Sequence, residues 1–226
     1  IALLLMAYAG PGDEVLHTAH GFLMYSISAK SIGASPMAVP ETNRTADVDA
    51  ILAAVTLSTK MVFLANPNNP TGTYLSAAEI KRLQAGLPPE VMLVLDGAYA
   101  EYMTEDDYDP GLELVATTPN TVMIRTFSKI HGLGGLRLGW AYAPPHVVDV
   151  LNRVRGPFNT SSAAQAAGAA AIQDEAFITK SIDHNTQCRA WFTQSVRDLG
   201  IRVDDSFGNF VLADFGDQDP EPLRLA

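Results

Sequence analysis

A lysine that could act as a nucleophile lies in a short polar turn between two apolar runs. Lys129 follows the run at residues 121–124 and precedes the run at 136–143, and both are rich in residues that favour strands. Such runs are typical of buried strands, so this lysine is not expected to be a solvated surface charge. A lysine in a desolvated pocket loses its proton more readily and becomes an amine nucleophile, which is the usual basis of Schiff-base chemistry.

The residues around this lysine are suited to hold an anion. Arg137 offers a planar fork of donors that matches a phosphate, and nearby glycines let the backbone come close. The hydroxyls of Thr126 and Ser128 could donate to the same anion. An amine nucleophile beside a phosphate cradle is what a pyridoxal phosphate (PLP) site requires. Taken alone, the segment could also be an ordinary glycine-rich turn. It is not a dinucleotide-binding fingerprint, because Arg137 occupies the third glycine position.

Three predicted strands end in polar residues. The strands cover residues 61–65, 91–95 and 121–124. The first leads into the loop 66–73, the second into the segment 96–99, and the third into Ser128 and Lys129. Ligands in open α/β sheets bind beyond the carboxyl ends of the strands. We therefore expect these polar residues to converge at one edge of the sheet.

Four side chains near this edge could complete a PLP site. Asp96 directly follows an apolar strand, and a cationic ring nitrogen would satisfy its buried carboxylate. Keeping that nitrogen protonated makes the cofactor an electron sink. Tyr99 and Asn69 could bind the phenolic oxygen of the ring, and Phe22 could stack on the ring. Each residue has an ordinary alternative: a turn aspartate, a core tyrosine, a turn asparagine or a core phenylalanine.

Three motifs in this order and spacing resemble the fold-type-I PLP-dependent aminotransferases, and most closely the histidinol-phosphate aminotransferase family. The motifs lie at residues 68–72, at 96–102, and at 126–129 together with 135–139. A weaker resemblance continues through 21–25 and 155–159. Gly97 departs from the family, which usually has glutamate there. The family's N-terminal arm, its glycine-rich phosphate loop and its C-terminal substrate-binding arginine have no counterpart, so the chain resembles a fragment lacking both ends.

The resemblance implies a role for each of these residues. Lys129 forms a Schiff base with PLP and then shuttles a proton between Cα and C4′. Asp96 holds the pyridinium, while Tyr99 and Asn69 contact the ring hydroxyl. The other cofactor contacts are Thr126, Ser128 and Arg137 around the phosphate and Phe22 on the ring. The candidates for the substrate side, across a dimer interface, are Tyr25, Phe158 and Asn159.

The function that the resemblance implies is histidinol-phosphate aminotransferase, which exchanges an amino group between histidinol phosphate and 2-oxoglutarate in histidine biosynthesis. A homodimer with shared active sites is implied as well. Aromatic amino-acid aminotransferases and threonine-phosphate decarboxylases share these motifs and remain alternatives. A PLP-fold binding domain without catalysis is a different class, although its hallmark would be a missing lysine. A metal-dependent hydrolase using His17, His20 and Asp96 is a further alternative, although no H-E-x-x-H motif occurs.

The composition restricts the partners and the compartment. The formal charge of −10 over 226 residues argues against nucleic acid or an anionic membrane as a partner. Cys188 is the only cysteine, which excludes a disulfide framework and favours the cytosol. The apolar run at residues 1–9 is too short to span a bilayer and lacks the basic residues of a signal peptide. We expect it to form a helix.

Strands that alternate with helices predict an α/β fold with a mainly parallel sheet, and the resemblance implies a seven-stranded sheet sandwiched by helices. Helices are expected at 1–9, 22–31, 46–56, 76–85, 145–155, 160–173 and 175–199. Strands are expected at 14–17, 35–39, 61–65, 91–95, 121–126, 136–143, 201–203 and 210–213. We predict a PLP-binding large domain over residues 1–175, and a connecting helix with the start of a small α+β domain over 176–226. A further element is expected to begin near Pro220.

Overall fold

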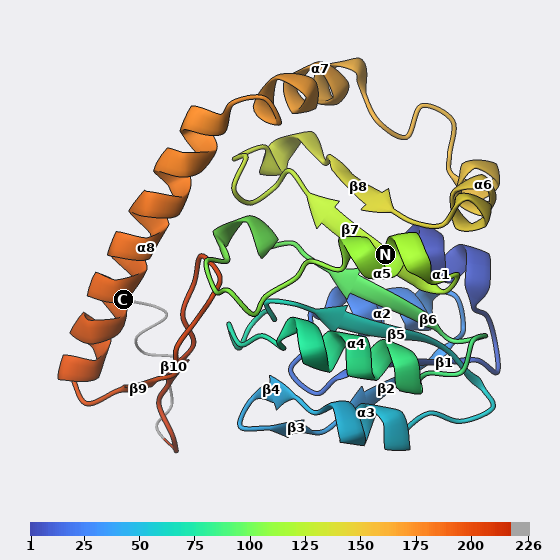
Figure 1. Cartoon of the computed structure of the whole chain (residues 1–226), viewed down its shortest axis with the longest axis horizontal. Helices are drawn as coiled ribbons and strands as arrows, with labels where there is room; N and C mark the ends of the chain where they lie inside the picture. Colours follow the sequence, from blue (N-terminus) through green and yellow to red (C-terminus); the bar gives the residue numbers. More distant parts are fainter. Residues whose placement is uncertain (218–226) are drawn as a thin grey trace.

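The computed structural model describes residues 1–217, and its main sheet has six strands in the order β2-β1-β5-β6-β7-β8 (Figure 1). The strands are β1 (Glu14–Thr18), β2 (Ser35–Val39), β5 (Thr59–Ala65), β6 (Met92–Asp96), β7 (Thr121–Thr126) and β8 (Gly139–Tyr142). Neighbouring strands run parallel from β2 through β7, and β8 alone is antiparallel. The predicted α/β fold with a mainly parallel sheet is confirmed. Within residues 1–217 the sheet has one strand fewer than the seven-stranded type.

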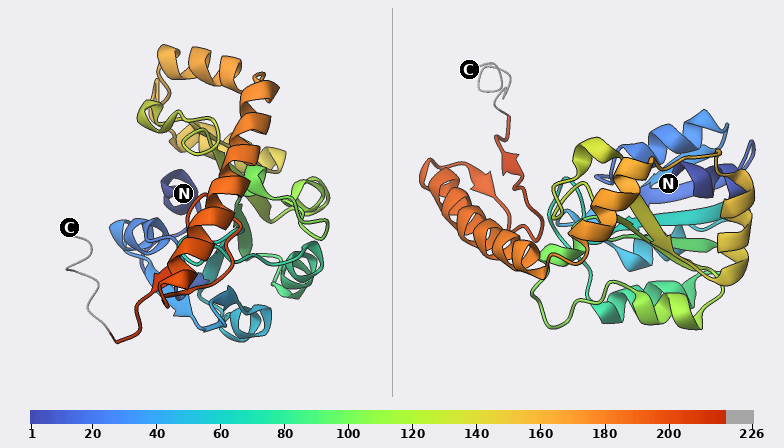
Figure 2. Two further views of the ribbon diagram at one scale, coloured as in Figure 1. Left: turned by 90° about the vertical axis from the view of Figure 1, so that its left-hand side faces the viewer. Right: turned by 90° about the horizontal axis from the view of Figure 1, so that it is seen from above.

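Helices cover both faces of this sheet (Figures 1 and 2). One face carries α3 (Val48–Ala53), α4 (Ala77–Gly86) and α5 (Leu112–Thr117), and the other carries α1 (Ala2–Tyr8), α2 (Met24–Ser31) and α6 (Pro145–Val154). Alternation along β5 explains the two layers: Val62 and Leu64 enter the first core, whereas Met61 and Phe63 enter the second. A continuous apolar strand is therefore buried on both sides.

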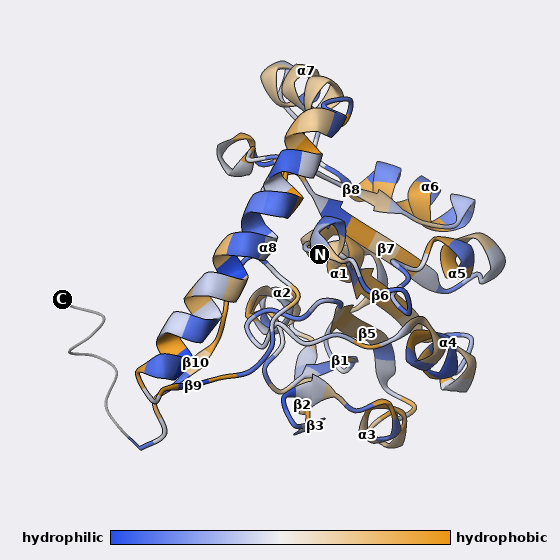
Figure 3. Cartoon of the chain, turned by 60° about the vertical axis from the view of Figure 1, so that its left-hand side comes forward, coloured by the Kyte–Doolittle hydropathy of each residue, from blue (hydrophilic) through white to orange (hydrophobic). Residues whose placement is uncertain are grey.

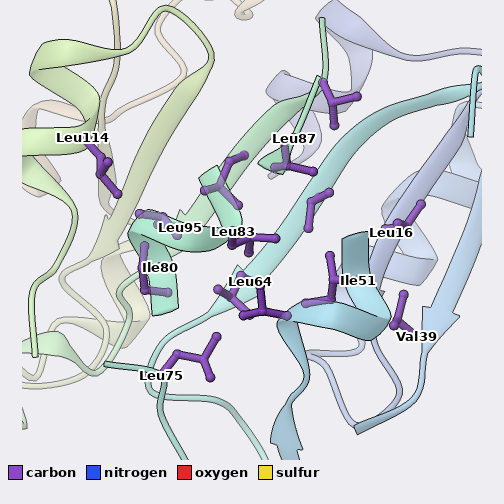
Figure 4. Close-up of a cluster of buried hydrophobic side chains, with 14 residues drawn as sticks. Leu16, Val39, Ile51, Leu64, Leu75, Ile80, Leu83, Leu87, Leu95 and Leu114 are labelled. Atoms are coloured by element: carbon purple, nitrogen blue, oxygen red, sulfur yellow. The ribbon is translucent and has the colours of Figure 1, made fainter. Parts of the chain in front are cut away.

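In the first core, between the sheet and helices α3, α4 and α5, a local sequence signal determines where a helix begins. In Figure 4, Ile51 of α3 and Leu83 of α4 lie against Leu64 of the sheet. Helix α4 begins where predicted, because the Ser76 hydroxyl accepts a hydrogen bond from the Glu79 amide. The Glu79 side chain pairs with Arg82 instead of returning to Ser76, so only half of the expected capping box forms.

The helix expected at residues 46–56 is shorter than predicted. Asp47 caps α3 by accepting a hydrogen bond from the Ala50 amide. The residues before it pair as a small hairpin, β3 (Glu41–Thr42) and β4 (Thr45–Ala46). The turn of this hairpin has two residues with positive φ, Asn43 and Arg44, as a tight two-residue hairpin turn requires.

The chain leaves the sheet through α7 (Ser162–Ala171) and the long helix α8 (Glu175–Asp198). Figure 3 shows hydrophilic residues along much of α8, in contrast to the apolar strands β5, β6 and β7. Beyond α8, the short strands β9 (Arg202–Val203) and β10 (Ala213–Asp214) pair antiparallel. Phe210 was expected in the last strand but packs against Tyr99 instead, so β10 forms later. The element expected near Pro220 lies outside the described residues.

The run at residues 136–143 differs most from the prediction. It was expected to be a buried strand, but β8 lies at the edge of the sheet, and Trp140 and Tyr142 are 40% and 38% exposed. An apolar run indicates a strand but does not say how many neighbours cover it. The sequence also gave no prediction for α5 or for the two short 3-10 helices Ala100–Tyr102 and Gly134–Leu136. None of the helices within residues 1–217 combines the length and apolar character needed to cross a membrane.

Candidate active site

A cavity of about 490 Å³ opens at the carboxyl ends of β5, β6 and β7. The last residues of these strands, Ala65, Asp96 and Thr126, all line it. Ligands bind at this position in open parallel sheets. All eight residues predicted to bind the cofactor line the same cavity: Phe22, Asn69, Asp96, Tyr99, Thr126, Ser128, Lys129 and Arg137.

Asp96 is a buried carboxylate at the end of β6, with only 7% of its surface exposed. The Tyr25 hydroxyl donates to its Oδ2 over 2.8 Å, and the Ala98 amide donates to its Oδ1 over 3.2 Å. Burial raises the pKa of Asp96, while these hydrogen bonds and the positive charge of Lys129 oppose the rise. A carboxylate held in this way favours a cationic partner in the cavity.

Tyr99 forms the wall beside this carboxylate. The Asn69 amide donates to the Tyr99 hydroxyl over 3.2 Å. The Tyr99 ring is buried and packs edge-on against Phe210, with ring centroids 5.0 Å apart. The half-buried Lys129 places its Nζ 5.1 Å from the centroid of the Tyr99 ring, within range of a cation–π contact. The predicted nucleophile and the two predicted ring contacts therefore meet on one wall.

The turn after β7 forms the cationic side of the cavity. The Ser128 amide donates to Thr126 Oγ1 over 3.0 Å, which shapes the turn just before Lys129. Arg137 has a left-handed backbone, with φ of 53°, and its guanidinium donates to the Gly134 carbonyl over 2.7 Å. Two side chains with positive charge and a serine hydroxyl from this turn thus line the cavity. They form a donor set suited to a small anion.

Phe22 lies on the outer wall of the cavity. Its ring is 37% exposed and meets the Tyr25 ring edge-on, with centroids 5.8 Å apart. A half-exposed aromatic ring beside a ligand cavity is available for stacking on that ligand.

Arg125 is a residue of this region that sequence reasoning missed. Its guanidinium donates to the Gly97 carbonyl over 3.2 Å and lies 3.5 Å from the Glu101 carboxylate. It therefore fixes the turn that carries Asp96 and Tyr99. A Cβ added at Gly97 would lie 3.1 Å from Cδ of Arg125, so the arginine fills the space beside this glycine. The available signal was a charged residue inside an otherwise apolar strand.

The three residues predicted for the substrate side do not gather in the cavity. Tyr25 borders it but is only 1% exposed and is hydrogen-bonded to Asp96, so its position does not match the predicted substrate contact. Phe158 is 97% exposed in the turn after α6, and Asn159 accepts a hydrogen bond from Arg155. Neither lines the cavity. Their contact with substrate across a dimer interface stays a prediction.

The histidines of the hydrolase hypothesis have other partners. His17 Nδ1 lies 2.8 Å from the Thr18 carbonyl, and His20 Nδ1 lies 2.7 Å from the Glu41 carboxylate. Within residues 1–217, no three His, Cys, Asp or Glu side chains are arranged to hold a metal ion. His17, His20 and Asp96 therefore do not form the metal centre that this hypothesis needs.

A model of the class I and II aminotransferase family matches residues 1–223. The chain belongs to this family. The histidinol-phosphate aminotransferase of Rhodospirillum rubrum is 57% identical over 220 residues, which cover 97% of this chain and 60% of that relative. The enzyme of the same name from Rhodospirillum centenum is 60% identical over 213 residues, which cover 94% and 59% of the two chains. The chain thus spans about three fifths of the length of these relatives.

Solved structures of the family share the fold. Histidinol-phosphate aminotransferase from Sinorhizobium meliloti, in complex with pyridoxal-5'-phosphate, has a TM-score of 0.92 at 28% identity, covering 99% of this chain and 60% of that chain. A tetra mutant of Thermus thermophilus aspartate aminotransferase has a TM-score of 0.86 at 24% identity, covering 97% and 63%. The second likeness concerns the fold alone. The predicted fold type I of PLP-dependent aminotransferases is confirmed.

Proposed function

We propose that this chain forms the cofactor-binding part of a PLP-dependent histidinol-phosphate aminotransferase. The observation that carries the proposal is the gathering of all eight predicted cofactor residues in one cavity. The buried carboxylate of Asp96 suits the protonated ring nitrogen of PLP, and the donor set of Ser128, Lys129 and Arg137 suits its aldehyde and phosphate ends. The donor set therefore fits this cofactor.

Each cofactor-binding residue of the chain has a distinct chemical role in this proposal. Bound PLP would supply an aldehyde that condenses with amines and a protonated ring that withdraws electrons from the substrate Cα. Lys129 provides the amine that attaches the cofactor and the base that moves the proton at Cα. Asp96 keeps the ring nitrogen protonated, because an ionised carboxylate favours the cationic form. Ser128 and Arg137 bind the phosphate oxygens.

Four further side chains complete the binding of the cofactor. Tyr99 and Asn69 already share a hydrogen bond at the cavity wall, and both can bind the ring hydroxyl. Phe22 covers the ring from the outer wall. Thr126 sets the turn through its contact with the Ser128 amide.

The proposed substrates follow from the relatives of about 57% and 60% identity, whose name is histidinol-phosphate aminotransferase. We place the reaction between histidinol phosphate and 2-oxoglutarate, in histidine biosynthesis in the cytoplasm. We further propose a homodimer in which Phe158 and Asn159 reach the substrate side of the partner's site. We assign residues 1–175 to the PLP-binding domain and residues 176–226 to the connecting helix and the start of a second unit. Ile178 and Ile182 of α8 pack against the cluster of Tyr99, Tyr102 and Ile130.

The test is borohydride reduction of the purified chain with added PLP, followed by peptide mapping. We expect one pyridoxyl adduct, on Lys129. Lys129→Ala should abolish it, whereas Lys81→Ala, which removes a surface lysine paired with Glu113, should leave it unchanged. Adducts scattered over surface lysines, or none, would overturn the proposed site.

The substrate requires a second assay, with the full-length protein that contains this chain. Transfer from histidinol phosphate in preference to aromatic amino acids is the expected result. Preference for an aromatic donor, or release of carbon dioxide from threonine phosphate, would replace the substrate assignment by one of the alternatives. An adduct on Lys129 without turnover of any donor would identify a PLP-binding domain without catalysis.

A further inference from the structure

Tyr25 is held in one position by the hydrophobic core. It lies in the first turn of α2, is 1% exposed, and stacks on Phe63 of β5 with centroids 4.8 Å apart and planes 18° apart. The Phe22 ring also meets the Tyr25 ring, edge-on, with centroids 5.8 Å apart. A buried ring packed against two aromatic neighbours keeps one rotamer, so its hydroxyl has a fixed direction.

That hydroxyl points to Asp96. Tyr25 donates to Asp96 Oδ2 over 2.8 Å, between two groups buried from solvent. Burial and the nearby carboxylate raise the pKa of Tyr25 well above its ordinary value, so the phenol keeps its proton and remains a donor. The Ala98 amide holds the other carboxylate oxygen over 3.2 Å. Together the two donors fix the plane of the carboxylate.

We propose that Tyr25 is a positioning residue, which keeps the Asp96 carboxylate ionised and oriented toward the cationic ring nitrogen of the cofactor. This inference rests on the proposed function, because it concerns the same site. It replaces the substrate contact predicted for Tyr25 from the sequence. A hydrogen bond to a buried carboxylate stabilises the ionised form, whereas burial alone favours the neutral acid. The neutral acid would no longer attract a ring cation.

Other charged and titratable groups also face Asp96. The Nζ of Lys129 favours its ionised form. Tyr108 lies close enough to be affected by the charge of Asp96. Among the side chains in the described part of the molecule, Tyr25 is the one that donates a hydrogen bond to this carboxylate. The effect assigned to Tyr25 is therefore separable by a substitution that removes only its hydroxyl.

The test compares Tyr25→Phe with Asp96→Asn and with a matched control, Tyr108→Phe. Tyr108 is a partly buried phenol, and it donates to a backbone carbonyl, that of Asn66, over 2.9 Å. We expect Tyr25→Phe to weaken PLP binding by up to about tenfold, because loss of this hydrogen bond lowers the fraction of Asp96 that is ionised and able to attract the ring nitrogen. In the Asp96→Asn background, Tyr25→Phe should have almost no further effect on binding.

The pH dependence of PLP affinity provides a readout that a structural role would not change. Without the hydroxyl, the pKa of Asp96 rises above its already raised value. As the pH falls, the carboxyl of the variant therefore gains its proton earlier than that of the unsubstituted chain. The loss of PLP affinity in Tyr25→Phe should therefore grow as the pH falls, whereas the loss in Tyr108→Phe should not depend on pH.

A second measurement needs no cofactor. Because the folded chain raises the pKa of Asp96, stability is lost as the pH rises through the folded pKa. Tyr25→Phe raises that pKa further, so its loss of unfolding free energy should grow with rising pH, and urea titrations at several pH values can measure this. The loss for Tyr108→Phe should not depend on pH in this way.

The outcomes separate the two proposals. If Asp96→Asn weakens PLP binding and Tyr25→Phe does not, the role of Tyr25 is wrong while the proposed function stands. If neither substitution changes binding, the proposed function is wrong and the role of Tyr25 is overturned with it. The positioning role would also be overturned if the loss of PLP affinity in Tyr25→Phe did not depend on pH and persisted in the Asp96→Asn background.

Discussion

The cavity has a carboxylate end, formed around Asp96, and a cationic end, formed by the turn that carries Lys129 and Arg137. The two ends differ in how deeply their side chains are buried. At the carboxylate end, Asp96, Tyr25 and Phe63 are all buried, and each is held by contacts between α2 and the central strands. At the cationic end, Lys129 is half-buried and Arg137 is exposed, and both lie in turns after β7. The first end is built by the same packing that stabilises the fold, whereas the second depends mainly on local hydrogen bonds.

This difference suggests how each end meets a ligand. The Asp96 carboxylate already has fixed partners and needs no rearrangement to receive a cation. The Arg137 guanidinium donates to the Gly134 carbonyl of its own turn and can exchange that weak bond for a stronger one to a phosphate. We therefore expect substitutions at the carboxylate end to alter both stability and binding, and substitutions at the cationic end to alter binding alone.

The largest expected effect is that of Lys129→Ala. Removal of the amine should eliminate covalent attachment of PLP completely, because Lys129 is the one lysine that lines the cavity among the described residues. The unfolding free energy should change by less than about 0.5 kcal/mol, as for other side chains outside the core. Borohydride labelling and urea titration measure the two quantities. A large loss of stability would place this lysine in the core and contradict the comparison.

The next largest effect is that of Phe63→Ala, which removes the ring beneath Tyr25. A cavity left by a buried phenylalanine costs about 3–5 kcal/mol of unfolding free energy. The substitution should also weaken PLP binding, because Tyr25 loses its support. Phe22→Ala is the matched control: its ring is 37% exposed, so the cost in stability should be near 1 kcal/mol while binding still weakens. Equal losses of stability in urea titrations would break the comparison.

These two regions also differ in how well the sequence predicts them. The apolar runs of β5 and β6 and the polar residues after them are local patterns, and they located both the strands and the cavity. The link between Tyr25 and Asp96 joins residues 71 positions apart, so no local pattern indicates it. The exposure of Trp140 was missed for the same reason, since it depends on which strand lies at the edge. Sequence patterns predicted which residues lie at the cavity better than they predicted which side chains contact one another.

Arg137→Gln tests the cationic end more directly. Loss of a charged bond to phosphate should weaken PLP binding about tenfold, and the effect should shrink in high salt. Binding of pyridoxal, which lacks the phosphate, should not change. Arg155→Gln, on an exposed arginine outside the cavity, is the matched control. A tenfold loss for pyridoxal as well would mean that Arg137 acts through the fold of the turn, not through the phosphate.

Thr126→Val should have the smallest effect and is the sharpest test of the difference between the two ends. Valine keeps the shape of threonine but removes the oxygen that accepts from the Ser128 amide. One neutral hydrogen bond of this kind contributes about 1 kcal/mol, so binding should weaken by roughly fivefold at most. Thr117→Val, which removes an exposed hydroxyl on α5, serves as the control. If Thr126→Val weakened PLP binding as much as Tyr25→Phe, the turn after β7 would be as rigid as the core beneath Asp96. Only in a turn held in one geometry does the loss of one neutral hydrogen bond reduce the affinity for the ligand that much.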